Sequence, residues 1–194
     1  LITPDEAADA VIVLAPGGTN AVDTALGHAA DELAQGRALF VFDVRGAGAV
    51  EQQPTNHIEN VWPRSYYSTP HWLSVCAYAL GECLFGMRVF DVLRAAEYLR
   101  AQFQKVHVRA WGFEPALWGY CGAALDPHIA SARIEGLLES YTAVVEAGEY
   151  RRDFLPSAMI HGVLREWDLP DLRLLFEGRQ LNVTTSGAAW KHAE

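Results

Sequence analysis

The sequence contains few cysteines and no metal-binding pattern. Its 194 residues include only three cysteines, Cys76, Cys83 and Cys121, which are too few and too scattered for a disulfide framework. We expect free thiols, with a Cys76–Cys83 disulfide as the alternative. No CxxC or clustered His/Cys spacing indicates a metal site, so we expect no metal and no other cofactor. The cysteines do not identify a cellular compartment.

Positive charge and long hydrophobic runs are also scarce. The chain has 15 Lys and Arg against 24 Asp and Glu, a formal net charge of −9. A nucleic-acid partner is not expected, because binding to phosphates needs a basic surface. No apolar run approaches the roughly 20 residues of a membrane-spanning helix, and the first ten residues lack the basic start of a signal peptide. We therefore expect a soluble chain without a membrane segment.

The remaining composition is typical of one globular domain over residues 1–194. Hydrophobic residues make up 51% of the chain and charged residues 20%, near the usual averages. Short apolar runs that end at turn residues predict buried strands of a parallel sheet. The predicted strands are 10–15, 38–42, 106–111, 129–134 and 180–185, and the predicted helices are 20–35, 87–103 and 115–125, with helical stretches near 140–146 and 157–167.

This alternation of strands and helices predicts an α/β fold. We expect a doubly wound, mostly parallel sheet of about five strands in the order 2-1-3-4-5. Local signals add detail: Ser140 and Asp168 are expected to cap helices, and Asp43 and Arg45 are expected to pair across a turn.

Residues 44–86 form a long connection that interrupts the alternation. A connection of this length is typical of a functional loop, a lid or a docking surface, and we expect a short helix at 75–80 within it. Its aromatic residues could stack on sugars or be buried against another domain, and we favour the domain interface. These aromatic residues are Trp62, Tyr66, Tyr67, Trp72 and Tyr78.

Four segments resemble parts of α/β-hydrolases. Residues 41–48 (VFDVRGAG) resemble the DxRGxG segment that follows the fourth strand of that fold. Residues 84–95 and 123–129 are similar to the elements on either side of the nucleophile strand in acetyl xylan esterases and dienelactone hydrolases. Residues 162–172 (GVLREWDLPDL) resemble a segment of large acetyl xylan esterase-like proteins. The resemblance implies the central part of an α/β-hydrolase fold, strands three to seven.

The resemblance also implies a mechanism whose nucleophile is missing here. The family uses a serine at a GxSxG turn, a histidine base, an acid and an oxyanion hole. In residues 112–116 (GFEPA), Glu114 stands where the serine is expected. A carboxylate is a poor replacement, because the mixed anhydride that it would form is more reactive than an ordinary ester. We therefore expect a catalytically degenerate domain.

Glu114 has three interpretations. It can stabilise a helix N-terminus through the helix dipole, which we favour. It can act as a carboxylate nucleophile, acid or base, for which His161 and His192 are the candidate partners in this chain. It can also be a ligand-binding carboxylate in a vestigial pocket.

Other residues take the family's oxyanion-hole and ligand positions. Gly17, Gly18 and Thr19 stand where the family builds its oxyanion hole, beside Phe113 and Pro115 at the predicted elbow. The same three residues would also serve an ordinary strand-to-helix turn, and we favour the turn.

The expected function follows from this resemblance. We expect a structural or accessory module of a larger carbohydrate-esterase-like protein, with other domains of that polypeptide as its partners. One alternative is an active hydrolase that uses Glu114 with a histidine of this chain or of a neighbouring domain. Another is a module that binds an acyl ester or a sugar without turnover. Family resemblance suggests secretion or a periplasmic location, although the sequence itself does not settle the compartment.

Overall fold

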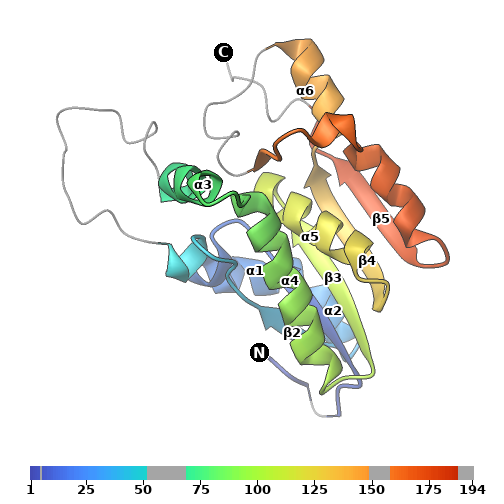
Figure 1. Ribbon diagram of the computed structural model, residues 1–194. Coiled ribbons are helices and arrows are strands. Elements are labelled where there is room, and N and C mark those ends of the chain that lie inside the picture. The colour runs from blue at the N-terminus through green and yellow to red at the C-terminus, as the bar shows by residue number, and fades with distance from the viewer. Residues whose placement is uncertain (5, 52–68, 149–157, 188–194) are drawn as a thin grey trace.

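A computed structural model describes residues 1–4, 6–51, 69–148 and 158–187. Within these residues, five strands form one all-parallel sheet in the order β2-β1-β3-β4-β5, which confirms the predicted α/β class and strand order (Figure 1). The strands are β1 (Asp9–Leu14), β2 (Ala38–Val41), β3 (Lys105–Trp111), β4 (Ile129–Leu137) and β5 (Gln180–Thr185).

Helices cover both faces of this sheet (Figure 1). Successive side chains of a strand point to opposite faces, so Val11 and Val13 of β1 pack with the first two helices while Ile12 and Leu14 join the larger apolar cluster on the other face. The α-helices are α1 (Val22–His28), α2 (Ala30–Ala34), α3 (Thr69–Ala79), α4 (Leu84–Arg100), α5 (Phe113–Leu125) and α6 (Tyr141–Ala147). Short 3₁₀ segments are η1 (Gly18–Ala21), η2 (Gly48–Val50), η3 (Val163–Arg165) and η4 (Leu169–Phe176).

The single helix predicted over 20–35 is instead η1, α1 and α2, with a break at Ala29. Arg109, buried on β3, explains the break. Its Nη2 donates to the carbonyl of His28 at 2.7 Å, and the N–H of Glu32 donates to Ala29 instead. A regular α-helix would pair Glu32 with His28. A side chain from a distant strand therefore interrupts the helical ladder.

Two further predictions need correction. The helical stretch predicted at 157–167 is not continuous: its described part has one helical residue, Ala158, and the short η3, and Gly162 turns the chain at a φ of 73°. β5 was predicted as a buried strand, yet its residues are half-buried or exposed. Among the described strands it lies at the edge of the sheet, with its neighbour β4 on one side only. The expected caps are confirmed: Ser140 caps α6 and Asp168 caps η4.

The long connection over 44–86 is partly described. Its described residues contain η2, α3 and the start of α4, so the short helix expected at 75–80 is present and longer than predicted. Trp72 and Tyr78 are exposed. Residues 52–68, which include Trp62, Tyr66 and Tyr67, lie outside the described part.

In the described residues, no single helix has the length and hydropathy needed to cross a membrane. Pro70–Ala79 and Leu84–Arg100 meet these criteria only when taken together, as a pair bent by 99°.

Candidate functional site

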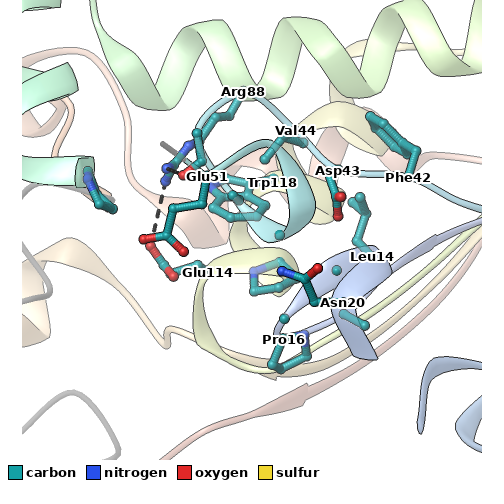
Figure 2. Close-up of a pocket in the computed structure, with 18 residues that line it drawn as sticks. Leu14, Pro16, Asn20, Phe42, Asp43, Val44, Glu51, Arg88, Glu114 and Trp118 are labelled. Atoms are coloured by element: carbon teal, nitrogen blue, oxygen red, sulfur yellow. Dashed lines mark hydrogen bonds and ion pairs between the residues drawn. The ribbon is translucent and has the colours of Figure 1, made fainter. Parts of the chain in front are cut away.

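A pocket of about 270 Å³ lies at the carboxyl ends of β1, β2 and β3 (Figure 2). In the sheet, β1 lies between β2 and β3. The connection after β1 leads to β2, and the connection after β2 leads to β3 on the opposite side of β1. Ligands of open α/β sheets bind in the crevice at this kind of switch point. Described residues of the pocket wall come from the end of β1, from the segments after β1 and β2, and from α3, α4 and α5. The pocket is therefore the candidate site.

The turn between β3 and α5 has its apex at Gly112, two residues before Glu114. Gly112 has φ 81° and ψ 163°, and no non-glycine residue of this turn has a positive φ. A nucleophile elbow holds its serine at the strained apex of the strand-to-helix turn. A Cβ atom at Gly112 would lie 2.5 Å from Cγ of Pro16, so this apex has no room for a side chain. The elbow position assigned to Glu114 from the sequence is thus an ordinary position in the first turn of α5.

Glu114 faces the buried guanidinium of Arg88. Its Oε1 lies 3.6 Å from Nη1 of Arg88, whose side chain is 1% exposed, whereas the Glu114 side chain is 39% exposed. Figure 2 shows Glu51 and Glu114 beside Arg88 at one end of the pocket. Glu114 also lies in the first turn of α5, where a negative charge interacts favourably with the helix dipole. This position agrees with the first interpretation of Glu114 and leaves the ligand-binding one open.

Backbone carbonyls and an aromatic ring hold Arg88 in place. Its Nε donates to the carbonyl of Arg45 at 3.1 Å and its Nη2 to the carbonyl of Gly46 at 3.3 Å. The guanidinium carbon lies 4.8 Å from the ring centre of Trp118, within cation–π range. Burial lowers the pKa of Arg88, and the negative charges of Glu114, Asp91 and Glu51 oppose that shift. The group remains charged, since the guanidinium does not lose its proton in proteins.

Asp43 organises the opposite end of the pocket. Its carboxylate accepts hydrogen bonds from the N–H of Thr19 at 2.7 Å, from the Thr19 hydroxyl, and from the N–H of Ala49 at 2.9 Å. Asp43 therefore does not need the predicted partner Arg45, which binds Asp91 of α4 instead. This carboxylate clamps two turns together and has a structural role.

The predicted oxyanion-hole residues form a turn. The N–H of Gly18 donates to the carbonyl of Ala15 at 3.0 Å, and the N–H of Thr19 is bound by Asp43. Gly17, with φ 77°, caps the 3₁₀ segment η1. Two of the three N–H groups expected to stabilise an oxyanion are thus occupied within the protein.

The other predicted site residues are dispersed. Pro115 lines the pocket, whereas Phe113 packs against the larger apolar cluster. His161 is exposed, its ring lies 4.6 Å from that of Tyr78, and it is not part of the described pocket wall. His192 lies outside the described residues. Among the described residues, no group of three His, Cys, Asp or Glu side chains could hold a metal ion.

Sequence reasoning missed the most distinctive group of the pocket, Arg88. A signal was available, because Arg88 precedes Val92, Ala95 and Leu99 by four, seven and eleven residues and so shares their buried helix face. A charged residue on an apolar helix face predicts a buried charge. Glu51 and Trp118 give no comparable signal, since only the fold brings them to this pocket.

In comparisons with protein-family models, curated proteins and solved structures, nothing matches this chain. The class of protein that the fold defines is an open, all-parallel α/β sheet with a pocket at its switch point.

Proposed function

We propose that this chain is a catalytically silent α/β-hydrolase-like domain of acetyl xylan esterase type. It serves as an accessory module of a larger carbohydrate-esterase-like protein and does not turn over esters itself. The sheet order and the motifs in residues 41–48 and 162–172 support the family part of the proposal.

One observation supports the proposed lack of catalytic activity. The apex of the β3–α5 turn is Gly112, which has no space for a side chain. A serine nucleophile has no place at that apex, because Pro16 occupies the space that its Cβ would need. Glu114 lies two residues further, in a helical turn and beside Arg88. Arginine does not accept a proton, so Arg88 cannot replace the histidine base of a hydrolase.

Substitution of Glu114 by serine tests this proposal. If Glu114 occupied a functional elbow, Glu114→Ser would restore the family's nucleophile and release 4-nitrophenol from 4-nitrophenyl acetate. We expect Glu114→Ser to be as inactive as the unchanged protein, because the apex is at Gly112. Activity of Glu114→Ser that is absent from the matched variant Glu114→Ala would contradict the proposal.

A second candidate function is binding of a small molecule without turnover. The observation that favours it is Nη1 of Arg88, a buried donor in the pocket wall with no hydrogen-bond partner among the described residues. Buried polar groups are rarely left in this state, and a ligand atom is one way to satisfy them. A saturable thermal shift caused by a small ligand would separate this function from a purely structural role.

A further inference from the structure

Two buried donors in the pocket wall make no hydrogen bond in the described part of the chain, although one of them faces an acidic side chain. Nη1 of Arg88 is one, and it points toward Glu114 inside the pocket (Figure 2). Nε1 of Trp118 is the other, on a ring packed against the same guanidinium. Leaving a buried donor without a hydrogen bond destabilises a protein, and more so when the group is charged. Both donors therefore favour a ligand that brings acceptor oxygens, and a carboxylate supplies two.

The charge of the pocket disfavours a simple anion. The described wall contains three acids, Asp43, Glu51 and Glu114, but only one base, Arg88. Asp43 is occupied by donors from Thr19 and Ala49, whereas Glu51 and Glu114 lie at the Arg88 end of the pocket (Figure 2). A ligand that carried only a carboxylate would add a fourth negative charge beside them. A positive group on the ligand would offset this repulsion.

We propose that the pocket binds a small zwitterion whose carboxylate and ammonium groups are neighbours, such as a free α-amino acid. The ligand carboxylate accepts from Arg88 and Trp118, and its ammonium group lies against Glu114 and Glu51. The inference rests on the ligand-binding candidate function and names the ligand class for that site. It uses the two donors that make no hydrogen bond and the two acids, Glu51 and Glu114, at this end of the pocket.

The remaining walls limit the size of the ligand. The pocket of about 270 Å³ is slightly below the usual range for small-molecule sites. Leu14, Phe42 and Val44 contribute apolar surface to it. An amino acid with a small apolar side chain, such as valine, suits these dimensions.

Three matched probes test the ligand class by isothermal titration calorimetry on the full chain. L-valine carries both charged groups, isovalerate lacks the ammonium group, and isobutylamine lacks the carboxylate. We expect L-valine to bind saturably and at least about tenfold more tightly than either single-charge probe, a difference of roughly 1.4 kcal/mol. D-xylose serves as the neutral polyol probe. Absence of valine binding, equal binding of valine and isovalerate, or preference for xylose would each overturn the inference.

Variants of the two acids, Glu114 and Glu51, locate the site while Arg88 itself is kept. Glu114→Gln and Glu51→Gln are each expected to reduce the preference for valine over isovalerate by about tenfold. Glu97→Gln is the matched control, because Glu97 is an exposed acid of α4 that pairs with Arg94 and is not part of the described pocket wall. An equal loss in Glu97→Gln would overturn the assignment to this pocket. Ester turnover would contradict the silent-domain proposal alone, since these titrations measure binding independently.

Discussion

Gly112 and Pro16 approach so closely that a Cβ atom at Gly112 would lie 2.5 Å from Cγ of Pro16. The two residues follow β3 and β1, the neighbouring strands that flank the switch point of the sheet. Gly112 also donates its N–H to the carbonyl of Glu135 at 3.0 Å, so the turn is fixed to β4 as well. In a hydrolase, the turn after this strand would hold the nucleophile. Here the same turn is packed closely against Pro16.

Because of this contact, we expect Gly112→Ala to destabilise the folded protein strongly. The substitution adds a clash with a proline ring to the strain of a positive φ, and we expect a loss of about 2–4 kcal/mol in the free energy of unfolding. Gly36→Ala is the matched control, since Gly36 has φ 76° but nothing within 4 Å of an added Cβ. It is expected to lose about 1 kcal/mol from backbone strain alone. Urea denaturation measures both, and equal losses would contradict the packing role of Gly112.

Asp43 predicts a second stability effect. Asp43→Asn replaces a carboxylate that accepts from Thr19 and Ala49 by an amide with only one acceptor oxygen. We expect a loss of about 1–3 kcal/mol in the free energy of unfolding. Asp23→Asn changes an exposed acid of α1 and is expected to cost less than about 1 kcal/mol. If both variants denature at the same urea concentration, Asp43 does not clamp the two turns.

Asp168 makes stability depend on pH. Burial alone would raise its pKa, but hydrogen bonds from the Thr142 hydroxyl and from the N–H groups of Tyr141, Thr142 and Leu169 hold the pKa below its usual 3.8. A lowered pKa in the folded state stabilises the protein above pH 3.8, and this stabilisation is lost as the pH falls through the folded-state pKa. Asp168→Asn should therefore be less stable than the unchanged protein near neutral pH.

Denaturation between about pH 7 and pH 3 measures this effect. The stability difference between the two proteins should shrink in the acidic part of the range. Glu146→Gln, which changes an exposed acid of α6, is the control for general charge effects. A stability difference for Asp168→Asn that stayed constant to the lowest pH would contradict the role assigned to the carboxylate.

The three cysteines predict different rates of alkylation. All are free thiols in the structure, as expected from the sequence. Cys76 is exposed, whereas burial raises the pKa of Cys121 to about 12. Because the thiolate is the reactive form, iodoacetamide at about pH 8 should modify Cys76 quickly and Cys121 only after denaturation. Peptide mass spectrometry identifies the modified residues, and rapid labelling of Cys121 in the native protein would contradict its burial.

The sheet could be predicted because its strands have a local signature. β1 and β3 are short apolar runs that end at Pro16 and Gly112, and they are buried whichever elements cover them. The break at Ala29 had no such signature, because it depends on Arg109, eighty residues further along the chain. The local pattern of apolar residues cannot predict that a distant side chain will bind the carbonyl of His28.

The site was harder to predict for the same reason. The sequence placed Glu114 near the correct edge of the sheet, yet the apex of its turn depends on the backbone of Gly112 and on packing with Pro16. Arg88 became important only because the turn at Arg45 presents carbonyl oxygens to it. Residue type and spacing identify candidates, whereas the fold decides which of them share a pocket.

Hydrolysis of 4-nitrophenyl acetate by the unchanged protein tests the central claim most directly. Glu114→Gln, which removes the carboxylate but keeps the shape of the side chain, is the comparison. The account predicts that both proteins release 4-nitrophenol no faster than a buffer control that contains the same concentration of denatured chain. Saturable turnover by the unchanged protein that disappears in Glu114→Gln would contradict it and would show that Glu114 acts on esters.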